Sequence, residues 1–364
     1  MKEINIYIFT NDPWYEYSGW RKQTETLIAE LKKIANSSFQ VITFGDELEN
    51  KNVAYRVKNV SRGEINRIKV TLKYINLFFS ERKKIDVIYL PKVHLTVLPL
   101  IIFGRLLGSN IITRISGAEV FGKGLKNRLK LFVLKFSNYC IALNNETVEI
   151  LKNYSINALY IPNAVDTKRF NSKHTSINET IGNFVLCTFG SVCKRKRVDV
   201  AIKVVASLKE KGIPVLLKII GPTEGFGEYE EEYLDYIKNF ISVNELDDSV
   251  QFLGMVDKPE LELKQCDVLL FPSESEGMPN ALLEAMACGV VPISNAIPGT
   301  EEIIHNDENG FLVKENNLEQ YISHCLELYN DKSRLFELSE KAVDFIRNHH
   351  DKTVIYKKYR KLFT

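Results

Sequence analysis

The sequence lacks any apolar run long enough to cross a lipid bilayer as a helix. Its most apolar window, residues 93–104, is 12 residues long and contains His94 and Pro99, whereas a spanning helix needs about 20 apolar residues. Ile4–Phe9 directly follows Met-Lys-Glu. A secretory signal has a basic start, a longer apolar run and a small-residue cleavage site. This segment does not fit that pattern, so we interpret it as a first strand. We therefore expect a cytoplasmic protein.

Closely spaced cysteine pairs are also absent. None of the six cysteines belongs to a Cys-x-x-Cys pair, which argues against a disulfide framework or a zinc site and favours reduced, buried thiols. Low-complexity tracts and Gly-X-Y repeats are lacking, and 45% apolar with 26% charged residues is typical of globular proteins. Fibrous and disordered classes are thereby excluded. The cysteines are Cys140, Cys187, Cys193, Cys266, Cys288 and Cys325.

The charge is unevenly distributed along the chain. Residues 1–165 contain 24 basic and 14 acidic residues, a net +10, and the remainder contains 24 basic and 32 acidic residues, a net −8. Such a division indicates that the two halves meet different partners. Two interpretations of the basic half stay open here. One is contact with an anionic acceptor or with the cytoplasmic face of a membrane, and the other is a solvated basic face.

Two series of short apolar runs alternate with amphipathic stretches, the rhythm of βαβ units in a parallel sheet. The first series predicts strands at Ile4–Phe9, 39–44, 86–90, Asn110–Ile115 and 139–143, with helices at 20–35, 64–80, 95–107 and 126–136. The second predicts strands at Phe184–Phe189, Val215–Ile220, 250–253, 267–271 and 290–294, with helices at 198–211, 228–243, 259–266 and 280–288. A short amphipathic helix is predicted at Lys352–Phe363.

A chain of 364 residues is long enough for two domains. The polar stretch 171–183 separates the two series and is the predicted linker. The predicted fold class is therefore α/β, with two doubly wound domains at residues 1–170 and 184–345 that face each other across a cleft. Such sheets bind ligands at the carboxyl ends of their strands, so we expect the functional residues there.

The most informative segment is FPSESEGMPNALLEAMACG at residues 271–289. A strand ends at Phe271, a loop follows, and Asn280 is the predicted N-cap of the next helix. The N–H groups at that helix start favour an anion such as a diphosphate. Glu276 in the loop and Glu284 in the helix present two carboxylates to one extended ligand, and carboxylates accept hydrogen bonds from ribose hydroxyls.

This segment resembles the donor-binding signature of the family 4 retaining glycosyltransferases, whose two glutamates are separated by seven residues, as Glu276 and Glu284 are here. Four further segments resemble motifs of that family in the same order: residues 86–107, PNAVDTKRF at 162–170, FGSVCKRKRVD at 189–199, and residues 299–313. The resemblance covers nearly the whole chain. It implies the GT-B architecture of two Rossmann-like domains, with residues 346–364 forming a C-terminal helix that crosses back to the first domain.

The resemblance also implies roles for individual residues. Glu284 would hold the ribose of a nucleotide-diphosphate sugar, and Glu276 would act on the donor sugar together with the loop that follows it. The residues that hold the donor sugar would be Glu276, Gly277, Met278, Pro279 and Asn280. The base would be contacted mostly through the backbone of Gly254, Met255 and Val256.

A second constellation, GSVCKRKR, begins at Gly190 directly after a buried strand. A glycine there permits close approach of a ligand to the backbone, and the four consecutive bases can neutralise phosphates. By resemblance, Gly190, Ser191, Arg195 and Lys196 would surround the donor diphosphate. Lys196 matches the lysine of the family, but Ser191 stands where the family has an arginine, so Arg195 would have to reach the phosphates instead. A solvated basic turn is the alternative interpretation.

The sequence contains weaker evidence for an acceptor site than for the donor site. Both tryptophans, Trp14 and Trp20, lie between the first strand and the first helix. Gly19 matches the glycine-rich acceptor loop of the family there. Aromatic faces stack on sugars, so we expect this loop to shape the acceptor site; a loop packed between domains is the alternative. Ser116 takes the place of a histidine that many family members carry near the acceptor.

No residue stands out as a general base. The family is thought to let the departing diphosphate take the acceptor proton, so catalysis would rest on charge stabilisation and positioning by Lys196 and Glu276. No Asp-x-Asp metal motif is present, and we expect neither a metal nor a cofactor. The expected partners are a nucleotide-sugar donor and a glycan or lipid-linked acceptor, not nucleic acid. A catalytically degenerate partner subunit and a sugar-nucleotide epimerase remain alternatives.

Overall fold

The computed structural model describes residues 3–10, 19–33, 37–43, 56–59, 67–117, 124–172, 184–224, 230–314 and 317–363. The chain divides into two compact units: unit 1 comprises Met1–Ala164 and Lys352–Thr364, and unit 2 comprises Val165–Asp351. None of the helices described is long and apolar enough to cross a membrane. The six cysteines are all buried, as predicted, and none is paired with another.

Unit 1 is built on one parallel sheet whose described strands follow the order β3-β2-β1-β4-β5-β6-β7. These strands are β1 (Ile4–Phe9), β2 (Ser37–Thr43), β3 (Arg56–Asn59), β4 (Val87–Leu90), β5 (Asn110–Ile115), β6 (Tyr139–Ala142) and β7 (Ala158–Tyr160). The helices are α1 (Gly19–Lys32), α2 (Arg67–Glu81), α3 (Leu98–Leu106), α4 (Leu125–Leu134), α5 (Asn145–Asn153) and α13 (Lys352–Phe363), with short 3-10 turns η1 (Arg82–Lys84) and η2 (Leu95–Val97).

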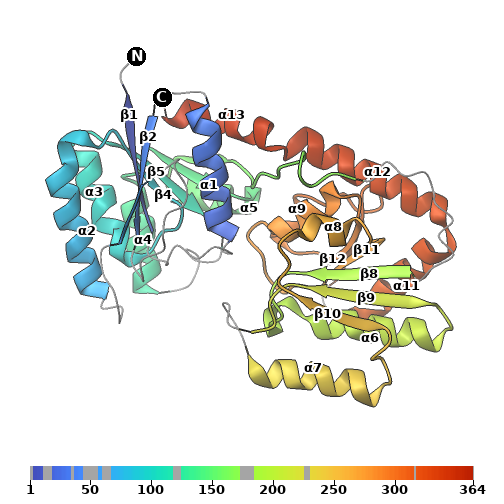
Figure 1. The fold of residues 1–364 in the computed structure, drawn as a ribbon. Helices are drawn as coiled ribbons and strands as arrows, with labels where there is room; N and C mark the ends of the chain where they lie inside the picture. The colour runs from blue at the N-terminus through green and yellow to red at the C-terminus, as the bar shows by residue number, and fades with distance from the viewer. Residues whose placement is uncertain are drawn as a thin grey trace. The chain divides into compact units, whose positions relative to one another are not determined.

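Alternate side chains of β1 enter two different cores, as the two-residue period of a strand requires. Tyr7 and Phe9 pack in a cluster with α2, α3, α4 and α5 on one face of the sheet. Ile6 and Ile8 pack in a second cluster with α1 and α13 on the other face. Figure 1 shows α13 beside α1 in this unit, although the two helices lie at opposite ends of the chain.

Unit 2 is built on a second parallel sheet with the described strand order β10-β9-β8-β11-β12-β13. The strands are β8 (Phe184–Phe189), β9 (Val215–Ile220), β10 (Val250–Gly254), β11 (Val268–Phe271), β12 (Val291–Asn295) and β13 (Phe311–Val313). The helices are α6 (Val198–Glu210), α7 (Glu231–Val243), α8 (Pro259–Leu263), α9 (Asn280–Ala287), α10 (Pro298–Glu301), α11 (Leu318–Asn330) and α12 (Lys332–His349), and a 3-10 turn, η4 (Lys194–Lys196), precedes α6. One core joins this sheet to α6, α7 and α11.

Most predicted elements are present, and several boundaries need correction. The strands predicted at Ile4–Phe9, Asn110–Ile115, Phe184–Phe189 and Val215–Ile220 are confirmed with the same bounds, and so is the helix at Lys352–Phe363. The predicted boundary between residues 345 and 346 falls inside α12, which continues to His349, so the returning segment begins at Lys352. The first division lies between Ala164 and Val165, before the predicted linker, most of which (173–183) lies outside the described residues.

Candidate functional site

Unit 2 brings two predicted site loops together at one edge of its sheet. Strands β8 and β11 are hydrogen-bonded neighbours in parallel register, with Leu186 opposite Val268 and Cys187 opposite Leu269. Their carboxyl ends therefore meet at the same edge. The loop after β8 begins at Gly190, and the loop after β11 begins at Pro272.

The loop after β8 begins and ends with residues in unusual backbone conformations. Gly190 has a φ of 138° and its N–H donates to the carbonyl of Ile220 at 2.9 Å. A Cβ on the neighbouring Gly221 would lie 2.0 Å from the carbonyl oxygen of Gly190, so the ends of β8 and β9 require glycine at residue 221. Arg197, with a φ of 50°, then turns the chain from η4 into α6.

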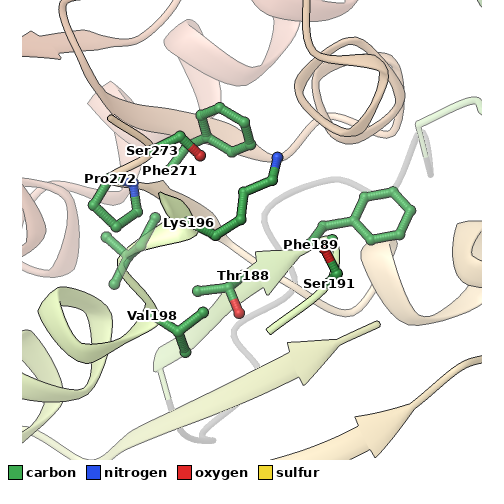
Figure 2. Close-up of a pocket in the computed structure, with 10 residues that line it drawn as sticks. Thr188, Phe189, Ser191, Lys196, Val198, Phe271, Pro272 and Ser273 are labelled. Carbon is green, nitrogen blue, oxygen red and sulfur yellow. The ribbon is translucent and has the colours of Figure 1, made fainter. Parts of the chain in front are cut away.

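Two cations from this loop converge on one carboxylate from the other loop. Lys196 Nζ lies 2.5 Å from Glu276 Oε1, and Arg195 Nη1 lies 3.0 Å from the same oxygen. The side chains of Lys196 and Glu276 are only 15% and 13% exposed, so solvent screens their attraction weakly. Figure 2 shows the Lys196 amine beside the ring of Phe271, whose centroid lies 5.0 Å from Nζ.

Two hydrogen bonds that involve backbone groups also join the two loops. The N–H of Glu274 donates to the carbonyl of Arg195 at 3.0 Å, and the Arg195 guanidinium donates to the carbonyl of Ser275 at 2.9 Å. Arg195 is therefore oriented by three groups of the loop after β11. Arg195 and Lys196 thus reach the same oxygen of Glu276. That Arg195 supplies the cation missing at Ser191 stays a prediction.

A further charge network, which the sequence analysis missed, lies next to these cations and holds Arg197, the residue that follows Lys196. Arg197 pairs with Asp199 at 3.1 Å and with Glu274 at 3.2 Å, and the Tyr233 hydroxyl donates to Asp199 at 2.9 Å. Burial raises the pKa of Asp199, but the hydrogen bonds from Arg197 and Tyr233, with the charges of Arg197 and Lys203, outweigh it and leave the pKa lowered. The carboxylate thus stays ionised and anchors Arg197 next to Lys196.

The loop after β11 rests on buried polar residues that the sequence analysis also missed. Asn295, at the end of β12, donates to the carbonyls of Pro272 and Ser273 at 2.9 and 3.2 Å. Tyr321 donates to the Asn295 amide oxygen at 3.1 Å, and the Thr300 hydroxyl donates to the Asn295 carbonyl at 2.6 Å. No periodicity marks these residues in the sequence. The only signal is the position of Asn295 at the carboxyl end of a strand.

Helix α9 follows the loop and carries the second predicted glutamate. The prediction that Asn280 is the N-cap is wrong by one residue: Pro279 is the cap and Asn280 is the first helical residue. The proline ring holds φ of Pro279 at −78°, and its extended ψ of 113° keeps this residue outside the helix, as an N-cap residue must be. Glu284 is 6% exposed and Met278 also lies buried, whereas Gly277 and Asn280 are half-buried.

The predicted base-contacting segment lies farther along the same edge. Gly254 ends β10 with a φ of 63°, and its carbonyl accepts a hydrogen bond from the N–H of Gly221 at 2.8 Å. Met255 is exposed and Val256 is half-buried. β10 stands three strand spacings from β11 in the sheet order, or roughly 14 Å at about 4.8 Å per spacing. The predicted base-contacting segment and the loop after β11 therefore lie at the same edge of the sheet, about that distance apart.

A pocket opens where β8 and β11 end. Of the predicted residues, Gly190, Ser191 and Lys196 line it, whereas Glu276 adjoins it through its ion pair with Lys196. Figure 2 shows the Lys196 side chain running toward Phe271 and Ser273, with Ser191 on the opposite side. The remaining lining residues are Thr188, Phe189, Val198, Leu270, Phe271, Pro272 and Ser273. Among the described residues, no cluster of three or more His, Cys, Asp or Glu could hold a metal ion.

The predicted acceptor residues belong to unit 1 and are only partly described. Gly19 is the exposed first residue of α1, and Ser116 is half-buried directly after β5. Trp14 lies outside the described residues, as does the side chain of Trp20, whose backbone forms part of α1. The structure therefore leaves the aromatic acceptor loop as a prediction.

Residues 170–349 match the family described as glycosyl transferases group 1. This match covers just under half of the chain and contains every residue predicted to bind the donor. A putative colanic acid biosynthesis glycosyltransferase, WcaL of Escherichia coli, is 31% identical over 162 residues, which are 42% of this chain and 37% of that protein. The chain thus spans less than half the length of this relative. An uncharacterised glycosyltransferase of Methanocaldococcus jannaschii is 26% identical over 349 residues, which are 91% of this chain and 91% of that protein.

Solved structures show the same fold over nearly the whole chain. The Anabaena protein HepE in complex with UDP and glucose has a TM-score of 0.81 at 16% identity, covering 98% of both chains. A sucrose-phosphate synthase from Thermosynechococcus elongatus has a TM-score of 0.81 at 16% identity, covering 99% of both. The predicted α/β fold of GT-B type is confirmed.

Proposed function

We propose that this chain is a retaining glycosyltransferase that moves a sugar from a nucleotide-diphosphate sugar to a glycan or lipid-linked acceptor in polysaccharide or glycoconjugate biosynthesis. One observation carries the proposal. Lys196 and Arg195 converge on Glu276 between the ends of two neighbouring strands, inside the region that matches the glycosyl transferases group 1 family. Both the cations that a diphosphate needs and the carboxylate that a sugar needs are thus assembled at one place.

The donor occupies the carboxyl edge of the unit 2 sheet in this proposal. Lys196 and Arg195, with the backbone at Gly190 and Ser191, bind the diphosphate, because two cations in a partly buried site form strong charge-assisted bonds to phosphate. Glu284 accepts hydrogen bonds from the ribose. Gly254, Met255 and Val256 contact the base through their backbone.

Diphosphate binding gives Lys196 and Arg195 a new anionic partner in place of Glu276. The Glu276 carboxylate is then available to accept hydrogen bonds from the donor-sugar hydroxyls, next to Gly277, Met278, Pro279 and Asn280. The ion pair with Lys196 and Arg195 therefore keeps Glu276 within reach of the sugar position. It also offsets the cost of leaving a half-buried carboxylate without a partner.

The transfer step needs charge stabilisation more than a general base. The bond between the anomeric carbon and the diphosphate oxygen breaks, and the acceptor oxygen bonds to that carbon on the same face. The acceptor proton passes to the departing diphosphate. Lys196, Arg195 and the N–H groups at the start of α9 stabilise the charge that develops on the leaving group. No metal takes part in this proposal, and the acceptor is assigned to unit 1 near Gly19 and Ser116.

Calorimetric titration with UDP, GDP and ADP tests the donor site directly. UDP is the first choice because the HepE structures contain it. We expect one nucleotide to bind the wild type and to bind Glu284→Ala at least tenfold more weakly, because the buried carboxylate is the proposed ribose acceptor. Glu232→Ala, an exposed glutamate on α7, is the matched control and should bind like the wild type. If no nucleotide binds, or if both variants bind equally well, the donor site is misplaced.

A further inference from the structure

Large apolar side chains are exposed on one face of unit 1. Of the fourteen exposed large apolar side chains in the part of the chain that the structure describes, eight lie on or directly after α2, α3 and α4. Monomeric proteins rarely expose apolar side chains in such a concentration unless the patch has a partner. These helices share one core under one face of the sheet, and Figure 1 shows α2 and α3 side by side there.

Helix α4 carries the clearest apolar stripe. Leu125, Leu129 and Phe132 are 84%, 50% and 58% exposed, and their spacing of four and three residues places them on one side of the helix. The opposite side of α4 buries Leu131 and Leu134 in the core. This helix is therefore apolar on both sides, whereas a helix that only covers a sheet presents polar residues to solvent.

Helices α2 and α3 extend the exposed stripe. On α2, Ile68 and Leu72 are 73% and 59% exposed, four residues apart and therefore on one side of the helix. Leu106 at the end of α3 is 72% exposed, and Leu107 follows it. Phe79 of α2 packs against Phe103 of α3 at 5.3 Å between ring centroids, so the two helices form a continuous surface.

The charged residues of this surface are almost all basic. Residues 67–84, 98–107 and 125–136 contain eleven lysines and arginines and a single acidic residue, Glu81. Most of the net charge of the first half of the chain is thus concentrated around the apolar stripe. A second copy of the chain would bring an equally basic face against it, and like charges repel. An anionic surface is the complementary partner.

We propose that the α2–α4 face of unit 1 docks on the surface of an anionic lipid bilayer. Leucine and phenylalanine side chains enter the boundary between headgroups and acyl chains, while lysine and arginine side chains pair with lipid phosphates. The apolar stripe and its basic flanks match the chemistry of this interface, which is apolar in the acyl region and anionic at the headgroups. The inference concerns unit 1 alone and does not depend on the transferase activity of unit 2.

Vesicle co-sedimentation of the full chain tests the proposal. We expect binding to vesicles that contain phosphatidylglycerol, much weaker binding to pure phosphatidylcholine vesicles, and a several-fold loss between low and high salt, because salt screens the attraction. The double variant Leu125→Gln with Phe132→Gln should lower the partition coefficient at least tenfold. Both side chains are exposed, so thermal unfolding of this variant should match the wild type.

Helix α7 offers a matched control on the acidic half. Tyr236 and Val243 are 46% and 71% exposed there, and glutamine at both positions should leave vesicle binding unchanged. Equal binding to both kinds of vesicle, no binding at low salt, or equal losses in the two double variants would overturn the proposal. Sedimentation velocity without lipid provides a further test, because self-association abolished by the α4 variant would assign the face to a second copy. Nucleotide titration of the same samples reports separately on the donor site.

Discussion

Lys196 is the residue on which the proposed transfer depends most. Its amine is held between the Glu276 carboxylate and the ring of Phe271, so it is positioned before the donor arrives. Removing one preorganised group that stabilises developing charge costs about 3 kcal/mol or more. We therefore expect Lys196→Ala to reduce turnover by about a hundredfold, measured as initial rates of sugar transfer and of nucleoside diphosphate release.

Lys194 is a matched control within the same turn. It is exposed and lies two residues earlier in η4, so Lys194→Ala changes the charge of the loop by the same amount. We expect its turnover to stay within about twofold of the wild type. Similar losses in both variants would point to the overall charge of the loop rather than to Lys196, and an unchanged rate for Lys196→Ala would remove that residue from the mechanism.

At the residue scale, the sequence indicates the residues that are proposed to bind the donor, whereas the residues that hold them in place are seen only in the structure. Lys196 and Glu276 are predictable because both follow apolar strands, whose carboxyl ends meet in a parallel sheet. Asn295 donates two hydrogen bonds to the loop after β11, and Asp199 accepts a hydrogen bond from Tyr233, 34 residues away. Such contacts between distant positions leave no period or spacing in the sequence, so only the folded chain reveals them.

Gly299 in helix α10 packs against the backbone of Glu276 and Gly277, in the loop that is proposed to bind the donor sugar. A Cβ on Gly299 would lie 2.6 Å from the carbonyl oxygen of Glu276 and 2.9 Å from that of Gly277. Gly299→Ala should therefore displace this loop and lower the affinity for the nucleotide-sugar at least tenfold, measured by calorimetry. Alanine is otherwise the better helix former by about 1 kcal/mol, so unchanged affinity with a higher melting temperature would contradict the expected clash.

Gly124→Ala provides the control for the same chemical change. Gly124 precedes α4, and a Cβ there would meet no atom within 4 Å. Its nucleotide-sugar affinity should equal that of the wild type. A matching loss in both variants would show that the effect does not come from the contact with Glu276.

Elements were predictable where burial on both faces gives a continuous apolar run. β8 and β9 lie in the middle of their sheet and were predicted with their observed bounds. β7 and β13 are strands of three residues at sheet edges, too short to show a period. Helices α5, α11 and α12 have ordinary amphipathic patterns but lie outside the two βαβ series that the sequence analysis followed.

At the scale of the whole molecule, α13 makes unit 1 dependent on the end of the chain. Its side chains Ile355, Tyr356, Tyr359, Leu362 and Phe363 are buried in the cluster that also contains α1. Asn110 in β5 donates to the carbonyl of Leu362 at 2.7 Å. Unit 1 therefore completes its core only when α13 packs on it, whereas the proposed donor site is built entirely within unit 2.

This division predicts that stability and donor binding can be separated. Tyr359→Ala removes a ring that is 4% exposed, and truncating a buried aromatic side chain costs about 3–5 kcal/mol. We expect faster amide hydrogen exchange in β1, α1 and α13, with protection in β8 and β11 and nucleotide affinity unchanged. Lys357→Ala, an exposed position on the same helix, should alter neither. If Tyr359→Ala weakened nucleotide binding as much as it loosened α1, the two units would have to fold as one, and the independence argued from their separate cores would be wrong.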